Sequence, residues 1–243
     1  MLSNYQFLET IQTSFKEFIN CKTSRSTAKL KPLHGAIAQD IATRLGDEYK
    51  IWAQGYETDK EIKINGRYID KKVDITIVNK QTGKPITGIA VKFVMQNYSQ
   101  NSNNYFENML GETANIRTTN CPYFQIFIIL DKLPYYEEKG KIKRWEKFTE
   151  CNIHKYCKLA EDNIEHFMHT PNKTLIYVIH VLPDISEKTK TKDEYMNYYN
   201  KHKKDICIEE TEKEYKELKK EGNIIFNDYK SFMDKIYHTI KSL

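Results

Sequence analysis

Two apolar runs constrain the fold of this chain more than any other feature. They are YFQIFIIL at residues 123–130 and TLIYVIHVL at residues 174–182. Both are rich in β-branched and aromatic residues and contain no Asp, Glu, Lys or Arg. A continuous run of this kind is typical of a strand that is buried on both faces. The sequence therefore predicts a central sheet that other elements of the chain cover.

Segments with helical periodicity accompany these strands. Apolar side chains recur every three or four residues along 4–19 and again along 33–45, where Gly46 provides a stop signal. The stretches 141–170 and 191–243 are heavily charged and predicted to be largely helical. Within the second, the apolar residues of 226–240 form one helix face, which serves as core or as a dimer interface.

Between these regions the pattern changes to short β-prone runs. They lie within 49–80, and Asn65-Gly66 marks a turn among them. The turn sequence QTGKP at 81–85 joins DITIV to GIAVKFV as a hairpin. An amide-rich loop over 96–104 and a helix up to Arg117 follow. The whole pattern predicts an α/β fold, with a central mixed sheet flanked by helices and a helical C-terminal part.

Length and composition narrow the class of protein. The 243 residues suffice for a single domain, 1–243, with a core at about 33–130. The first twenty residues lack the apolar segment of a signal peptide, and no apolar run approaches the ~18 residues of a membrane span. Five cysteines without a CxxC pair suit reduced thiols, so we expect a cytoplasmic protein. A net charge of +5 permits an anionic partner.

The hairpin brings together a carboxylate and a lysine. Alternation along GIAVKFV puts Ala90 and Lys92 on the face opposite Val91. Asp74 begins the preceding strand, so Asp74 and Lys92 can face the same cleft. Such a pair suits metal-assisted hydrolysis of a phosphodiester, in which the carboxylate binds Mg²⁺ and the lysine orients the water or offsets developing charge. Taken singly, Asp74 could be a turn residue and Lys92 an edge lysine.

At these residues the sequence resembles the PD-(D/E)XK nuclease superfamily and, within it, the type II restriction endonucleases. The resemblance covers about 33–130 and rests on LHGAIAQDIATRL, INGRYIDKKVDITIV, GIAVKF and GETANIR, in that order. It implies a restriction-endonuclease-like core and Mg²⁺-dependent, site-specific hydrolysis of double-stranded DNA. By this resemblance Asp74 and the main-chain carbonyl of Val91 would bind the metal, and Lys92 would be catalytic. It also implies a homodimer, since two-fold symmetry suits the cutting of a palindrome.

The chain departs from the family pattern at one key position. Ala90 stands where the family has Asp or Glu, and Val73 replaces the proline before Asp74. In a subgroup of restriction enzymes the second carboxylate lies on the following helix, which here offers Glu112, the preferred candidate, and Glu107. Alternatively the chain is an inactivated variant or a natural pseudo-nuclease that only binds DNA. A PD-(D/E)XK nuclease of repair or defence is a further alternative.

Three segments could hold DNA. The loop after Lys92 is rich in amide side chains, which hydrogen-bond bases and phosphates; its candidates are Gln96, Asn97, Gln100, Asn101, Asn103 and Asn104. The segment 188–204 interleaves lysines with tyrosines, with Lys190, Lys192 and Tyr198 as candidates. The basic stretch 22–31 is the third.

Two other metal hypotheses follow from the residue types. Asp40, on the second helix, is a candidate extra acid for a second metal. His34 opens the same helix and could contact a phosphate, although a capping or core role is favoured. The cysteines and histidines of CNIHKYCKLAEDNIEHFMH (151–169) are zinc-type ligands. Their spacing fits no familiar zinc finger, so structural zinc is not expected.

Overall fold

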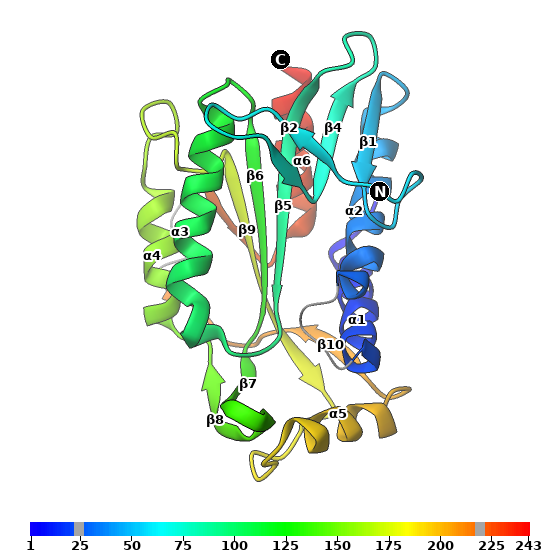
Figure 1. Ribbon diagram of the computed structural model, residues 1–243, viewed down its shortest axis with the longest axis vertical. Helices are drawn as coiled ribbons and strands as arrows, with labels where there is room; N and C mark the ends of the chain where they lie inside the picture. Colours follow the sequence, from blue (N-terminus) through cyan, green and yellow to red (C-terminus); the bar gives the residue numbers. More distant parts are fainter. Residues whose placement is uncertain (22–26, 217–221) are drawn as a thin grey trace.

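The protein folds around one mixed sheet, described here from a computed structural model (Figure 1). The structure describes residues 1–21, 27–216 and 222–243. The helices are α1 (Asn4–Cys21), α2 (Lys31–Leu45), α3 (Tyr98–Arg117), α4 (Glu150–Ala160), α5 (Lys192–Lys201) and α6 (Tyr229–Lys241). The strands of the main sheet are β1 (Tyr49–Ala53), β4 (Ile75–Asn79), β5 (Pro85–Val94), β6 (Tyr123–Leu130), β9 (Lys173–Leu182), β10 (Cys207–Glu210) and β11 (Ile224–Phe226). Short pairs are β2 (Ile62–Ile64) with β3 (Lys71–Val73), and β7 (Lys132–Tyr136) with β8 (Ile142–Lys147).

The sheet order is β1-β4-β5-β6-β9-β10, and β11 also pairs with β9. In this sheet β4 is antiparallel to both β1 and β5, whereas β5, β6 and β9 are parallel to one another. A parallel pair needs a crossover, which α3 provides between β5 and β6 and α4 between β6 and β9. Figure 1 shows α3 and α4 on one side of the sheet and α1 and α2 on the other.

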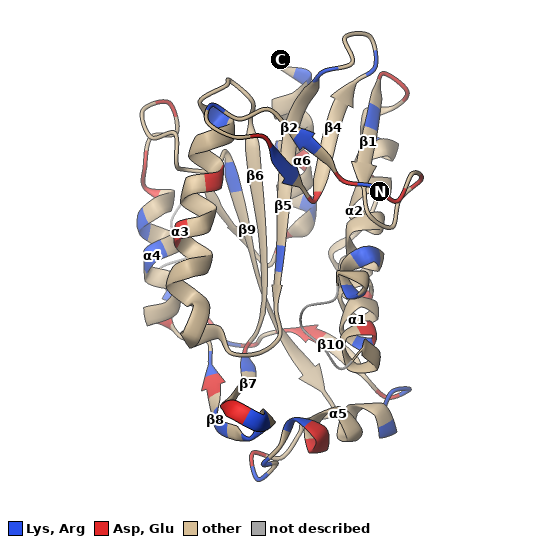
Figure 2. Cartoon of the chain, in the orientation of Figure 1, with Lys and Arg blue, Asp and Glu red and all other residues tan. Residues whose placement is uncertain are grey.

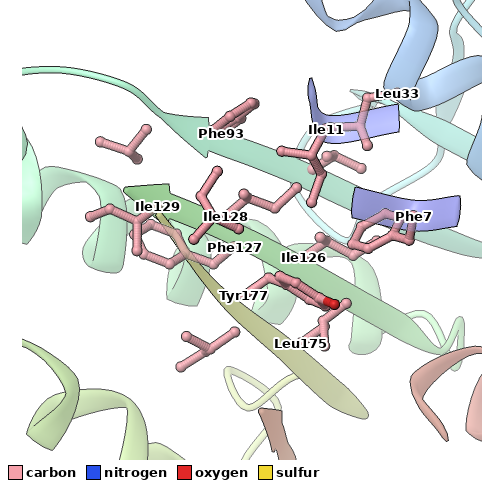
Figure 3. Packing of buried hydrophobic residues seen from close by; sticks show 14 of the residues in the cluster. Phe7, Ile11, Leu33, Phe93, Ile126, Phe127, Ile128, Ile129, Leu175 and Tyr177 are labelled. Atoms are coloured by element: carbon pink, nitrogen blue, oxygen red, sulfur yellow. The ribbon is translucent and has the colours of Figure 1, made fainter. Parts of the chain in front are cut away.

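The hydrophobic core follows the central strands. Every residue of β6 is buried, and so are most residues of β9, as expected for strands covered on both faces. Phe7 and Ile11 of α1 and Leu33 of α2 cover one face of these strands (Figure 3). The α/β class and the central mixed sheet flanked by helices are thus confirmed.

A smaller cluster packs on the opposite face of β5, beneath the β2–β3 pair. It joins Ile64, Val73 and Tyr123 with Ile116 and Cys121. At Gly88 an added Cβ would lie 2.7 Å from the Ile64 side chain and 2.9 Å from the Tyr123 ring, so a side chain does not fit without movement. This close packing fixes the β2–β3 pair over β5 and sets the position of Asp74, which follows β3 directly.

Some expectations for the secondary structure were wrong. Residues 98–104 belong to α3 rather than to a loop, because Tyr98 is buried against Phe127 and Phe148 and holds the first turn of the helix. The segment 141–170 begins with β8, and the region after 191 contains β10 and β11. β10 and β11 pair with β9, a distant partner that local periodicity does not reveal, whereas β8 pairs with the neighbouring β7.

The C-terminal helix is a core element. Its apolar face, with Phe232, Met233, Ile236 and Ile240 between 0 and 2% exposed, packs into the main core. The phenol of Tyr229 donates a hydrogen bond to Asp40 of α2. The candidate dimer interface over 226–240 is therefore corrected: the chain's own core occupies this face.

Candidate active site

A cavity of about 930 Å³ lies between β5, the β3 strand and α3, with part of β6 at its wall. Its charged lining residues are Lys29, Lys71, Lys72, Lys92, Asp74, Glu107 and Glu112. Figure 2 shows positive residues on the short strands β2 and β3 and on β5, with negative residues on α3 across from them. The cavity thus combines carboxylates and lysines in one place.

Asp74 lies at the break between β3 and β4, where the chain passes from the small sheet to the main one. The backbone N–H of Val91 donates a hydrogen bond of 2.7 Å to its Oδ2. Burial raises the pKa of Asp74 to about 6; the Val91 hydrogen bond opposes this shift and the charge of Glu112 adds to it. The hairpin therefore holds a carboxylate in a region where its negative charge is poorly compensated.

Lys92 extends from β5 into the cavity on the face opposite Val91, as the alternation predicted. Its Nζ lies 4.2 Å from the centroid of the Tyr105 ring, a cation–π contact with α3. Loss of water around the ammonium group lowers the pKa of Lys92, and the charge of Asp74 opposes this shift. The structure therefore brings Asp74 and Lys92 together, from β5 and the strand beside it.

Of the two glutamates on α3, Glu112 lies in the same group. Its carboxylate forms an ion pair of 2.8 Å with Lys71 and accepts a short hydrogen bond from the Tyr123 hydroxyl. Its charge also acts on Asp74. Glu107 lines the cavity too, but its charge acts on Lys155 of α4. Burial lowers the pKa of Lys155, and the charge of Glu107 opposes this shift. The geometry favours Glu112 over Glu107 as the partner of Asp74.

Sequence reasoning missed two residues of the site, Lys71 and Tyr123, which hold Glu112. Lys29, from the predicted basic stretch 22–31, lines the cavity as well, and burial and the charge of Lys92 lower its pKa. The INGRYIDKKV run contains Lys71, but only the fold shows that the β2–β3 pair lies against α3. Nothing in the sequence around Tyr123 distinguishes it from the rest of a buried strand.

Asp74 also belongs to a second group of side chains. His34 of α2, Glu61 just before β2, and Asp74 each offer one ligand atom, and these atoms lie within 4.8 Å of one another. Burial lowers the pKa of His34 to about 4, which Glu61 opposes, so the imidazole is neutral at pH 7. Burial also raises the pKa of Glu61, and the Asp74 charge adds to that shift. We expected His34 to cap the helix or to pack in the core; it is buried, and it also lies near two carboxylates.

The amide candidates divide between the cavity and the scaffold. Gln96, Asn97 and Asn101 line the cavity. Asn97 also has a structural role, because its Oδ1 accepts a hydrogen bond of 2.8 Å from the N–H of Tyr136 in β7. The remaining candidates lie on the first turns of α3, and all are exposed: Gln100, Asn103 and Asn104.

Other predicted residues lie apart from this cavity. The Asp40 carboxylate accepts hydrogen bonds from the Leu2 N–H, the Arg44 side chain and the Tyr229 hydroxyl, so it ties α2 to the N-terminus and α6. Lys190, Lys192 and Tyr198 lie at or on α5 and do not line the cavity. Of the basic stretch 22–31, residues 22–26 lie outside the described residues, whereas Thr27, Lys29 and Leu30 do line the cavity.

Among the residues that the structure describes, the cysteines and histidines of 151–169 form no group of metal ligands. None of the described helices combines the length and the apolar character that a membrane crossing requires.

Comparisons with protein-family models, with curated proteins and with solved structures find no match to this chain.

Proposed function

We propose that this protein is a Mg²⁺-dependent nuclease of the PD-(D/E)XK kind that cleaves double-stranded DNA at specific sites, as a type II restriction endonuclease. One observation carries the proposal: Asp74, Lys92 and Glu112 converge on one cavity from three different elements. The order of these elements, a strand hairpin followed by a helix and a parallel strand, is the order that the resemblance implies.

The donor set suits Mg²⁺, which prefers carboxylate and carbonyl oxygens. Asp74 and Glu112 supply carboxylates. In an extended strand the N–H and C=O of one residue point to the same side, so the carbonyl of Val91 is directed to the edge where its N–H meets Asp74. A bound Mg²⁺ would polarise the phosphate and supply positive charge to the transition state. Its binding would also relieve the repulsion between the two carboxylates.

The residues of the chain would supply the rest of the chemistry. Lys92 would orient the attacking water through its ammonium hydrogens or offset the negative charge that develops on the phosphate. The ring of Tyr105 limits the positions open to that ammonium group. Lys71 would neutralise Glu112 until the metal takes its place, and the Tyr123 hydroxyl would hold the carboxylate in position.

Ala90 is consistent with a second carboxylate on α3. It is half-buried beside the small cluster, and it leaves no acid next to Lys92 on β5. Glu112 is the residue whose charge reaches Asp74 from α3. The lysines at the cavity and the net charge of +5 support an anionic polymer as substrate.

The test is the incubation of plasmid and phage DNA with purified protein in Mg²⁺ and in EDTA. We expect discrete, metal-dependent fragments. Lys92→Ala and Glu112→Gln should each lower the cleavage rate by at least about 100-fold, the scale of lost electrostatic stabilisation at an active site. Glu107→Gln, on the same helix, is the matched control and should stay within a few-fold of the wild type.

The other outcomes discriminate among the alternatives. Nicking or smearing without fixed sites would favour a repair or defence nuclease. Ala90 supports a second candidate, a DNA-binding protein without catalysis, because the acid of the family pattern is missing from β5. That candidate predicts DNA that is bound in Ca²⁺ and remains intact in Mg²⁺, and this result would overturn the proposed cleavage.

A further inference from the structure

His34 is unusual for a core histidine, because it is buried without a hydrogen-bond partner among the described residues. The residue is 4% exposed, and neither of its ring nitrogens has a hydrogen-bond partner among the described residues. A neutral imidazole carries one donor and one acceptor, and a buried polar atom without a partner costs about 1–3 kcal/mol. Such a histidine needs a physical reason for its position.

Two carboxylates face this imidazole. Glu61 comes from the end of the loop after β1, and Asp74 comes from the break between β3 and β4. One ligand atom of each residue lies within 4.8 Å of the other two. Bonds of about 2.0–2.2 Å from a metal ion to N and O ligands place the ligand atoms roughly 3–4 Å apart. Small side-chain movements would therefore bring all three atoms onto one ion.

The backbone around the three residues is closely packed. A Cβ on Gly35, next to His34, would lie 2.2 Å from the carbonyl oxygen of Gly55, so the loop after β1 rests directly on the first turn of α2. Asp59 fastens the same loop, with a hydrogen bond of 2.7 Å from the Gly55 N–H and an ion pair of 2.5 Å with Lys31. Within it, the Gln54 side chain donates a hydrogen bond of 2.8 Å to Glu61.

We propose that His34, Glu61 and Asp74 form a binding site for a divalent transition-metal ion such as Mn²⁺, distinct from the Mg²⁺ site formed by Asp74, Glu112 and the Val91 carbonyl. An imidazole nitrogen with two carboxylate oxygens favours a first-row transition metal over Mg²⁺ or Ca²⁺, which take oxygen ligands. A dication at this position would offset both carboxylate charges and use the lone pair of the buried imidazole. The two sites share Asp74, so an ion in one would influence the other.

The site can be tested without DNA, so failure of the nuclease proposal and failure of this one are distinguishable. Calorimetric titration of the full-length, EDTA-treated protein with MnCl₂ should show one site that excess Mg²⁺ displaces poorly. His34→Gln and Glu61→Gln should each weaken Mn²⁺ binding by at least about 10-fold. His166→Gln, at an exposed histidine, is the matched control and should bind as the wild type does.

A spectroscopic measurement guards against variants that fail to fold. Pulsed EPR of the Mn²⁺-bound wild type should show coupling to an imidazole nitrogen, which requires no substitution. The coupling should disappear in His34→Gln and persist in His166→Gln. Absence of nitrogen coupling in the wild type would overturn the proposal. Equal Mn²⁺ affinity in a folded His34→Gln variant, or binding no stronger than that of Mg²⁺, would do the same.

Discussion

At the scale of single residues, Asp74 is the side chain on which the site depends. It accepts a hydrogen bond from Val91, shares the cavity with Lys92 and Glu112, and lies close to His34 and Glu61. Concentrated charge of this kind is typical of functional sites, and it destabilises the fold in the absence of a ligand.

The first prediction concerns the pH dependence of stability without metal. Because the folded protein holds the pKa of Asp74 at about 6, above its ordinary value of 3.8, the folded state binds this proton more tightly than the unfolded state. The stabilising effect of that proton is complete below about pH 4 and is lost as pH rises through 6. Asp74→Asn should therefore raise the free energy of unfolding above pH 6 by about 1–3 kcal/mol.

Urea unfolding in EDTA, from pH 4 to pH 8, measures this effect. Variant and wild type should converge near pH 4, where both side chains are neutral. A variant that is less stable than the wild type at pH 7 would contradict the assigned environment of Asp74. The same substitution should abolish cleavage, which would separate stability from function at this residue.

At the scale of elements, α3 links the site to the β2–β3 pair. Asn115 is buried, and its Oδ1 accepts hydrogen bonds from the N–H groups of Tyr68 and Ile69. Its Nδ2 donates a hydrogen bond of 2.8 Å to the carbonyl of Ile69. These bonds hold the turn between β2 and β3 close to the cavity, with the Tyr68 side chain 79% exposed. Lys71 and Asp74 follow this turn, so Asn115 helps to set their positions.

The second prediction follows from these hydrogen bonds. Asn115→Ala removes the three hydrogen bonds between the buried Asn115 amide and the backbone of the turn, and it should lower the free energy of unfolding by about 1–3 kcal/mol. Amide hydrogen exchange should accelerate at Tyr68 and Ile69. Asn104→Ala, at an exposed position of the same helix, is the control and should change stability by less than about 0.5 kcal/mol. Unchanged exchange in Asn115→Ala would mean that the turn is held by other contacts.

At the scale of the whole molecule, the two ends of the chain close the core together. α6 packs on α2 and β9, and Phe7 of α1 stacks on Tyr229 of α6 with ring centroids 4.0 Å apart. Arg44 of α2 forms an ion pair of 2.5 Å with Asp234 of α6. The hairpin of β4 and β5 therefore rests on a core to which the last helix contributes directly.

The third prediction tests the role of α6 as core. Phe232 is 0% exposed, and Phe232→Ala should lower the free energy of unfolding by about 3–5 kcal/mol. Because this face is covered within one chain, the molar mass in light scattering should be the same for variant and wild type under native conditions. Lys230→Ala, on the exposed side of the helix, is the control. A change in oligomeric state without a loss of stability would restore the interpretation of α6 as an interface.

The local pattern of the sequence determined much of the fold. Apolar runs identified β6 and β9, helical periodicity identified α1, α2 and α6, and the QTGKP turn identified the hairpin of β4 and β5. Alternation along β5 predicted that Lys92 lies on the face opposite Val91, and Lys92 lines the cavity. These features depend on neighbours in the chain, and burial of one face leaves a periodic signal.

Tertiary structure alone decided which distant residues share the site. The sequence left Glu107 and Glu112 open, and the position of Lys71 and Tyr123 around Glu112 distinguishes them. The sequence favoured a capping or core role for His34, because a single histidine carries no periodic or motif signal that would indicate a metal site. The group that His34 forms with Glu61 and Asp74 depends on α2, the loop after β1 and the β3–β4 break meeting in space. Such meetings are long-range contacts, which no local periodicity encodes.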